Sequence, residues 1–311
     1  MKIVLFGGSG FVGQYLVREL AADGHQCAVL TRNAVRHREF RLEKGARLVQ
    51  ADVFSMEHLL REFEGADAVV SMAGILNESG FGGKGFRRVH VELVRGIVDA
   101  CKEAGIRRLL HVSALNAGQG KSHYLQSKGE AEELLRAAEA DVTIFQPSVI
   151  FGPGDSFFNR FAGLLRMAPA LPLACPRSRL QPVFAGDVAA AMASALGDPS
   201  THGRTYELGG PRDYTLLELV RWTAETLGLK RWVVPLPGFI SRTQAAMLDF
   251  VPGKPFSTDN YHSLQVDNVT KQNALRYFGI VPGSVENIVP DYLGVSLRQR
   301  RLGSMRERAG R

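Results

Sequence analysis

The sequence has few cysteines and no long hydrophobic run. Its three cysteines, Cys27, Cys101 and Cys175, are widely spaced and form no CxxC pair, which argues against a disulfide framework and against a cysteine-based metal site. Each lies in or beside an apolar segment, so we expect buried free thiols, as in a reducing cytoplasm. The apolar stretch at 69–76 is far shorter than the roughly 18 residues that a transmembrane helix needs. No signal-peptide pattern is present, and we therefore expect a cytoplasmic protein.

The sequence also lacks a broad excess of charge. The net charge is +7, but residues 298–311 hold six arginines and one glutamate, so most of that charge belongs to this basic tail. A body so close to neutrality disfavours nucleic acid as a partner. Two interpretations of the tail stay open: a solvated terminus, which we favour, or a contact with anionic lipid or an acidic partner.

The strongest pattern is a strand, a glycine-rich turn and a helix at the start of the chain. Lys2–Phe6 is an apolar run, and Gly7, Gly10 and Gly13 follow it, before apolar residues recur at helical spacing. A second strand is expected at Gln26–Leu30. In this βαβ context the first glycine allows a tight turn, the second lets backbone approach a pyrophosphate, and the third lets the helix pack closely. The pattern predicts a dinucleotide site at the N-terminus of the helix.

An acidic residue that NAD sites usually contain is absent. Such sites place a carboxylate at the end of the second strand, about 20 residues after the glycines, to bind the ribose 2′-hydroxyl. Here the strand ends in Thr31 and Arg32, and Arg36 and Arg38 follow with no carboxylate before Glu39. A guanidinium can bind a 2′-phosphate in a bidentate way, so the sequence favours NADP(H) over NAD(H), with Arg32 as the main candidate. Arg36 and Arg38 could equally be solvated helix charges.

Strand and helix patterns alternate through the first half of the chain. Strands are expected at 47–51, 68–71, 108–113 and 142–146, and helices at 56–64, 86–104 and 122–138. This order predicts an α/β fold of Rossmann type, with a doubly wound parallel sheet and a small C-terminal α/β lobe.

The proline-rich stretch 149–185 interrupts this alternation, which then resumes at 183–208. We therefore expect a nucleotide-binding domain at 1–155 with return segments at about 183–209. The substrate lobe is expected at 156–182 and 210–297, followed by the basic tail at 298–311.

A second constellation falls on the fifth strand and the helix after it. Tyr124 and Lys128 are four residues apart, on one face of the predicted helix. A nearby ammonium stabilises a phenolate, so Lys128 should lower the pKa of Tyr124 and make the phenol a usable acid or base near neutral pH. Ser113 ends the preceding strand, where a parallel sheet presents side chains to the ligand crevice, and its hydroxyl can hold a substrate oxygen. We predict Ser113, Tyr124 and Lys128 as the catalytic residues.

These residues together resemble the short-chain dehydrogenase/reductase superfamily over essentially the whole chain. The segments HVSALNA, YLQSKGEAE, QPSVIFGPGDSFFNRF and VFAGDVAAA are similar to its extended or atypical branch, notably to the NADPH-binding accessory subunit of complex I and its bacterial relatives. The resemblance implies an adenine pocket at Asp52 and Val53, a ribose contact at Ala73 and Gly74, and Pro147 and Ser148 beside the nicotinamide. With the glycine turn and Lys128 included, the expected nucleotide contacts are Gly7, Gly10, Phe11, Val12, Gly13, Thr31, Arg32, Asp52, Val53, Ala73, Gly74, Lys128, Pro147 and Ser148.

Three functions stay open at this point. The leading one is an NADP(H)-dependent oxidoreductase for a small carbonyl or quinone-related substrate, which the resemblance connects to complex I or ubiquinone metabolism. The second is a structural or assembly protein that holds NADPH without chemistry, with the tail contacting a respiratory complex or lying peripherally at the inner membrane. The third is a nucleotide-sugar epimerase or dehydratase, against which Arg32 counts because such enzymes normally retain NAD.

Other polar and aromatic residues have structural interpretations. His111 lies inside an apolar strand and is expected to be a core histidine with its hydrogen bonds satisfied. Asp187, before an alanine-rich run, predicts a helix N-cap. Phe157, Phe158 and Phe161 lie along one helical segment, where core packing is the simpler interpretation and lining of an apolar pocket the alternative. No metal site is predicted.

Overall fold

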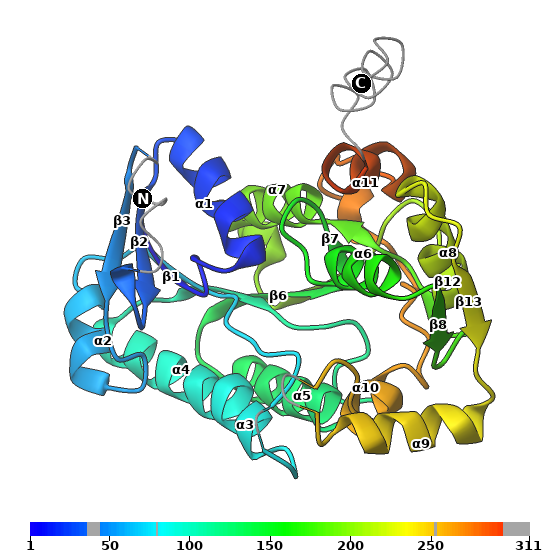
Figure 1. Cartoon of the computed structure of the whole chain (residues 1–311). Coiled ribbons are helices and arrows are strands. Elements are labelled where there is room, and N and C mark those ends of the chain that lie inside the picture. The colour runs from blue at the N-terminus through cyan, green and yellow to red at the C-terminus, as the bar shows by residue number, and fades with distance from the viewer. Residues whose placement is uncertain (36–43, 79, 252–253, 295–311) are drawn as a thin grey trace.

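The computed structural model describes residues 1–35, 44–78, 80–251 and 254–294, and its centre is a seven-stranded sheet (Figure 1). Every pair of neighbouring strands is parallel. In spatial order the strands are β11 (Arg204–Leu208), β6 (Asp141–Pro147), β5 (Arg108–Val112), β4 (Ala68–Ser71), β1 (Lys2–Phe6), β2 (Gln26–Thr31) and β3 (Ala46–Gln50). The strand order reverses at β1, as in a doubly wound sheet, so the predicted Rossmann-type fold is confirmed.

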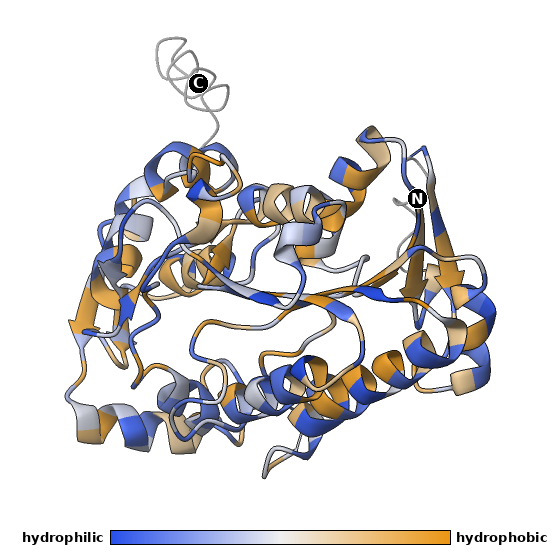
Figure 2. Ribbon diagram, turned by 180° about the vertical axis from the view of Figure 1, so that it is seen from behind, coloured by the Kyte–Doolittle hydropathy of each residue, from blue (hydrophilic) through white to orange (hydrophobic). Residues whose placement is uncertain are grey.

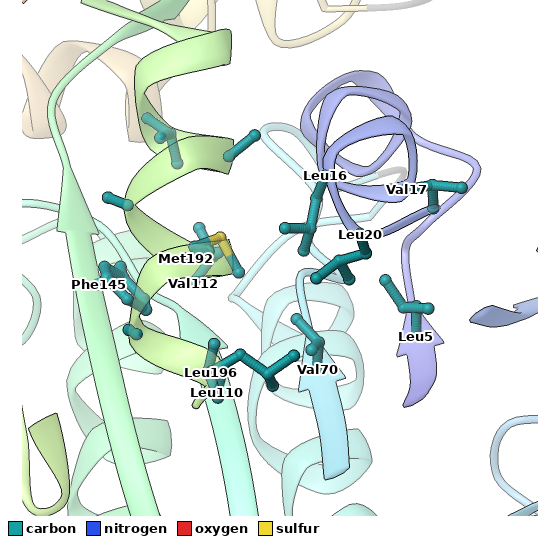
Figure 3. Close-up of a cluster of buried hydrophobic side chains, with 14 of the residues drawn as sticks. Leu5, Leu16, Val17, Leu20, Val70, Leu110, Val112, Phe145, Met192 and Leu196 are labelled. Atoms are coloured by element: carbon teal, nitrogen blue, oxygen red, sulfur yellow. The ribbon is translucent and has the colours of Figure 1, made fainter. Parts of the chain in front are cut away.

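Helices cover both faces of this sheet, and each face has its own hydrophobic core. On one face α1 (Phe11–Ala22) and α7 (Ala185–Leu196) pack on the strands, with Leu16 and Leu20 of α1 near Met192 of α7 (Figure 3). On the other face lie α2 (Met56–Phe63), α4 (Leu93–Ala104) and α5 (His123–Arg136). The central strands are buried on both faces and read as continuous apolar runs, most of them hydrophobic in colour (Figure 2).

A third cluster of buried side chains lies beside the sheet and is formed by later segments. It joins α6 (Phe157–Met167), α8 (Leu216–Thr226) and α11 (Val285–Leu293). The remaining elements are β7 (Ile150–Phe151), β8 (Ala170–Leu173), β9 (Arg179–Leu180), β10 (Val183–Phe184), η3 (Pro199–Thr201), β12 (Tyr214–Thr215), β13 (Trp232–Pro235), α9 (Gly238–Leu248), α10 (Thr258–Ser263) and η4 (Ala274–Arg276). Strands β7/β10, β9/β12 and β8/β13 form three small two-stranded sheets. The domain boundaries themselves stay a prediction.

The helix predicted from residue 86 to 104 is interrupted. A short turn α3 (Lys84–Phe86) leads into the π-helical segment η2 (Arg87–Glu92), and α4 begins only at Leu93. The wider π-turn accommodates an extra residue and places His90 and Val91 in the interior. Periodicity at 3.6 residues per turn does not detect this change of winding.

The predicted N-cap at Asp187 is wrong. Helix α7 begins two residues earlier, with Phe184 as its N-cap residue. Asp187 lies inside the first turn, and its Oδ2 accepts a hydrogen bond from the backbone N–H of Gly283, 2.7 Å away. The carboxylate therefore ties the helix to a distant loop, a partner that local sequence does not show.

The contact between α1 and the glycine turn yields a matched pair of glycine substitutions. A Cβ at Gly13 would lie 2.3 Å from the carbonyl oxygen of Gly7 and 2.5 Å from the Cα of Gly8, whereas a Cβ at Gly96 of α4 would meet no atom within 4 Å. Gly13→Ala should lower the free energy of unfolding by about 1–3 kcal/mol through overpacking. Gly96→Ala should raise it by about 0.5–1 kcal/mol because alanine is the better helix former. Chemical denaturation of both variants checks this, and equal stabilities would contradict the described contact.

Candidate functional site

The glycine turn after β1 leaves room for a ligand against bare backbone. Gly7 has φ +76°, and a Cβ there would lie 2.8 Å from the backbone nitrogen of Ala73. Gly10 is the N-cap residue of α1 and has no side chain to cap it, so the first N–H groups of the helix point outward without a side-chain acceptor. This is the arrangement that binds a pyrophosphate in dinucleotide sites. The residues present therefore fit a dinucleotide.

A cavity of about 990 Å3 opens at this turn and runs along the carboxyl edge of the sheet. Of the residues predicted from sequence, the cavity lining includes Gly7, Gly10, Phe11, Val12, Gly13, Thr31, Arg32, Val53, Ala73, Gly74, Ser113, Tyr124, Lys128, Pro147 and Ser148. The structure thus brings the two predicted constellations, far apart in the sequence, into one cavity. Their roles stay predictions.

Arg32 follows strand β2 and Asp52 follows strand β3, and the two differ in their relation to the cavity. Arg32 is exposed and lines the cavity, as a contact with a ribose phosphate requires. Asp52 is not among the lining residues, and its Oδ1 instead accepts a hydrogen bond from the backbone N–H of Phe54 at 3.0 Å. Its neighbour Val53 and Phe54 do line the cavity. Arg36, Arg38 and the basic tail lie outside the described residues.

Ser113 and Tyr124 both line the cavity. The Oγ of Ser113 is buried and has no hydrogen-bond partner among the described residues. A buried hydroxyl without a partner is costly, and a ligand oxygen would satisfy it. The half-buried ring of Tyr124 packs edge-on against Phe86 and His90, with centroids 6.0 and 5.5 Å away.

Lys128 is almost fully buried, and its Nζ donates to the carbonyl oxygen of Val112 at 3.0 Å. Burial lowers the pKa of Lys128 to about 8, with Glu132 opposing the shift. Burial also raises the pKa of Tyr124 to about 12, and the Asp259 carboxylate adds to that rise. The expectation that Lys128 lowers the pKa of Tyr124 is therefore wrong, because removal from water and the Asp259 carboxylate both raise this pKa and Lys128 is not among the charges that shift it.

His90 links the two halves of the site. Its Nε2 accepts a hydrogen bond from the backbone N–H of Ile75 at 3.1 Å, so Nδ1 carries the proton and donates to Ser127 Oγ at 2.8 Å. Ser127 Oγ in turn donates to the carbonyl oxygen of Tyr124. Burial and the neighbouring Lys128 lower the pKa of His90 to about 2, so the ring stays neutral. The loop after β4 and the helix that carries Tyr124 are thereby held together.

The prediction that His111 is a core histidine with its hydrogen bonds satisfied is only half right. His111 is buried, but neither ring nitrogen has a hydrogen-bond partner among the described residues, and neither has the nearby strand residue Ser71. Burial holds the pKa of His111 well below its usual range, with Lys128 and His90 adding to the effect. The strand pattern predicts that such a residue points inward, but it does not show whether a hydrogen-bond partner is present there. The three cysteines are buried and free, as predicted.

The cavity continues from Tyr124 into the C-terminal lobe, where sequence reasoning assigned no individual contacts beyond the phenylalanines. Phe157 and Phe161 line it, whereas Phe158 is part of the buried core. The other apolar lining residues in this part are Leu164, Leu171, Pro172, Leu173, Ala174, Leu180, Leu216, Leu248, Pro255, Phe256 and Leu264, and the polar ones are Ser156, Arg160, Gln244, Asn260, Ser263 and Asn268. This half of the cavity is mostly apolar. These residues come from segments that carry no motif, so only the tertiary structure reveals them.

Comparison with known proteins agrees with the nucleotide site. A family profile described as NAD(P)H-binding matches residues 7–155. The chain is 30% identical to mouse NADH dehydrogenase [ubiquinone] 1 alpha subcomplex subunit 9, over 91% of this chain and 77% of that protein. It is 31% identical to a ceramide reductase from Caulobacter vibrioides, over 79% of this chain and 77% of that protein. The chain therefore belongs to the NAD(P)-binding Rossmann-type family that includes these proteins.

Solved structures with the same fold are more distant in sequence. A dTDP-glucose 4,6-dehydratase from Streptomyces venezuelae, solved with NAD, superposes with a TM-score of 0.73 at 21% identity and covers 97% of both chains. A UDP-glucose 4-epimerase from Thermus thermophilus, also with NAD, has a TM-score of 0.66 at 22% identity over 84% of this chain and 99% of its own. At these identities the likeness concerns the fold. Within the described part of the chain, no helix is long and apolar enough to cross a membrane.

The lowered pKa of Lys128 predicts how nucleotide affinity depends on pH. A dinucleotide brings negative charge into the cavity and favours the protonated amine, so binding takes up a proton once the pH exceeds about 8. Affinity should therefore fall as pH rises from 7 to 10, by at most about tenfold per pH unit. Lys128→Met should remove this dependence, and the exposed control Lys121→Met should keep it. Fluorescence titration of NADPH across this range is the measurement, and a flat wild-type profile would contradict the assignment.

Proposed function

We propose that this protein is an NADP(H)-dependent oxidoreductase that reduces a carbonyl group carried on an apolar substrate. The buried, unpartnered Oγ of Ser113, in the cavity that Tyr124 also lines, is the observation that carries the proposal. A substrate carbonyl oxygen would restore the missing hydrogen bond at that point. Arg32, the apolar lobe and the relatives add support but do not carry the argument.

The side chains at the site have separate roles in the proposed reduction. The bound nicotinamide would supply the hydride. Ser113 Oγ–H donates to the carbonyl oxygen and orients it, while the Tyr124 hydroxyl gives the proton that completes the alcohol. A phenol with a high pKa holds its proton until charge develops on the substrate oxygen. Lys128 brings a positive charge to the same cavity, and His90 fixes the helix that carries Tyr124 and Lys128.

The substrate class follows from the lobe half of the cavity. Most of its lining is apolar, as at Phe157, Leu164 and Leu248, and polar side chains are the minority. An alkyl or isoprenoid chain, as in a lipid ketone or a quinone, would fill this space. The similarity to a protein named ceramide reductase supports a lipid-like substrate. A nucleotide-sugar epimerase or dehydratase function is less consistent with this lining.

A second candidate is a protein that binds NADPH and performs no chemistry. The similarity to a subunit of NADH dehydrogenase, over 91% of this chain, is the observation that favours it. The two candidates differ in whether Tyr124 has a chemical role, because both need the same nucleotide contacts.

Replacement of the phenol separates these candidates. Tyr124→Phe removes one oxygen and leaves the ring packed against Phe86 and His90. Oxidation of bound NADPH by long-chain ketones or quinones, followed optically in single turnover, should slow by roughly a hundredfold or more, the scale of losing a positioned acid. NADPH affinity should change less than a few-fold, and the exposed control Tyr277→Phe should change neither. If no ketone or quinone oxidises NADPH in the wild type, the carrier function is favoured.

Nucleotide choice is tested at Arg32. The wild type should bind NADPH more tightly than NADH, and Arg32→Ala should lose about 1.5–3 kcal/mol of NADPH binding, roughly ten- to a hundredfold, with little effect on NADH. Arg95→Ala removes an equal, exposed charge on α4 and serves as control. Calorimetric titration with both nucleotides measures the difference, and equal wild-type affinities would remove the NADP(H) assignment.

A further inference from the structure

We propose that helix α9 and the loop after it dock on an anionic membrane surface, from which an apolar substrate enters the cavity. This inference rests on the proposed function for the identity of the substrate, but the docking surface is argued independently. α9 lies at the lower edge of the molecule, next to α10 and away from the helices that cover the sheet (Figure 1). One side of α9 packs inward through Ser241 and Ala245.

The outward side of α9 is hydrophobic where a surface helix is normally polar. Phe239 is 75% exposed, Met247 69% and Phe250, just beyond the helix, 81%. Ile240 and Val251 add to the same apolar surface. Single exposed apolar residues are common, but five in 13 consecutive positions form a patch of the kind that marks an interaction surface. We call these five residues the α9 patch.

The α9 patch extends onto a second segment. The ring of Phe81, itself 61% exposed, lies 5.9 Å from the ring of Phe250, measured between centroids. Lys254 Nζ lies 4.2 Å from the centre of the Phe81 ring. Two loops that are distant in the sequence thus present aromatic rings together, next to a cation. Aromatic rings beside lysine and arginine are typical of surfaces that sit in the headgroup region of a bilayer.

The charges at the patch favour anionic lipid as the partner. Arg242 is exposed on α9, and Lys254 follows in the loop. The nearby Asp249 carboxylate is engaged by Thr258, whose N–H and Oγ–H both donate to it. A second copy of this chain docked symmetrically on the patch would gather Arg242 and Lys254 of both copies in one interface, which is unfavourable for like charges. The phosphate headgroups of anionic lipids can bind both cations without this repulsion between like charges.

The patch is continuous with the cavity through the same helix. Residues three and four apart lie on one side of a helix, so Gln244, between Ile240 and Met247 on that side, belongs to the same stripe. Gln244 and Leu248 line the cavity, whereas Ile240 and Met247 are exposed. One turn of helix therefore separates the outer apolar surface from the apolar interior. A lipid chain leaving the bilayer along α9 would reach the lobe half of the cavity without crossing water.

Vesicle binding by the full chain tests the surface. The variant Phe239→Ser/Phe250→Ser should bind phosphatidylglycerol-containing vesicles about tenfold or more weakly than the wild type, because two rings no longer bury apolar area in the interface. Val281→Ser, at an equally exposed residue outside the patch, is the matched control and should bind like the wild type. Pure phosphatidylcholine vesicles should bind more weakly than anionic ones. Equal binding of all three proteins would overturn the proposal.

A fluorescent label distinguishes the patch from any other membrane contact, the basic tail included. The native cysteines are buried, so Met247→Cys and Val281→Cys can each be labelled with an environment-sensitive dye. The fluorescence emission of the dye at 247 should shift to shorter wavelength when vesicles are added, and the emission of the dye at 281 should not. Vesicle binding without a shift at 247, or a dimer in light scattering that the double serine variant abolishes, would contradict docking on lipid. NADPH oxidation with a short soluble ketone needs no vesicle, so failure of docking and failure of the proposed chemistry are told apart.

Discussion

The close approach of helix α1 to the turn after β1 is the constraint on which the site depends. A side chain at Gly13 would overlap the backbone of Gly7 and Gly8, and one at Gly7 would overlap the backbone of Met72 and Ala73. These contacts fix β1, α1 and the loop after β4 relative to one another through backbone alone. That loop continues to Gly74, where a Cβ would lie 3.5 Å from both His90 Nε2 and Lys128 Nζ. The glycine turn and the part of the cavity at Lys128 are thus connected through the loop after β4.

Buried polar groups at the carboxyl edge of the sheet show what this assembly is arranged to bind. The hydroxyls of Ser71 and Ser113 and both ring nitrogens of His111 lack partners among the described residues, and Lys128 is held with a lowered pKa. Each such group costs stability in the free protein. Ser113 and Lys128 line the cavity, as does Asn77, whose buried Oδ1 also lacks a partner among the described residues, so a ligand can reach these three. His111 and Ser71 lie next to each other in the register of β4 and β5 and make the interior below them polar.

The parts of the molecule that the sequence predicted well are those set by local pattern. Glycine spacing located the turn, apolar runs located the strands, and the end of a strand located Ser113 at the cavity, where the family resemblance also placed Pro147. The errors have a common cause, which is dependence on distant neighbours. The partner of Asp187 is 96 residues away, and the pKa of Tyr124 depends on burial and on Asp259 from α10. The π-turn at His90 and the lining of the lobe likewise follow from tertiary packing, which no local spacing encodes.

The two halves of the cavity are built on different principles, and this bears on how function varies among relatives. The nucleotide half is formed largely by backbone, at Gly7, Gly10, Ala73 and Gly74, so its shape depends on glycine at the close contacts rather than on particular side chains. The lobe half is formed by side chains such as Phe157, Phe161 and Leu248, and each substitution there alters what fits. Proteins named as a reductase and as a subunit of NADH dehydrogenase can therefore share the first half. In the proposed function the second half selects the substrate, and there α9 provides both an inner wall and the exposed apolar surface.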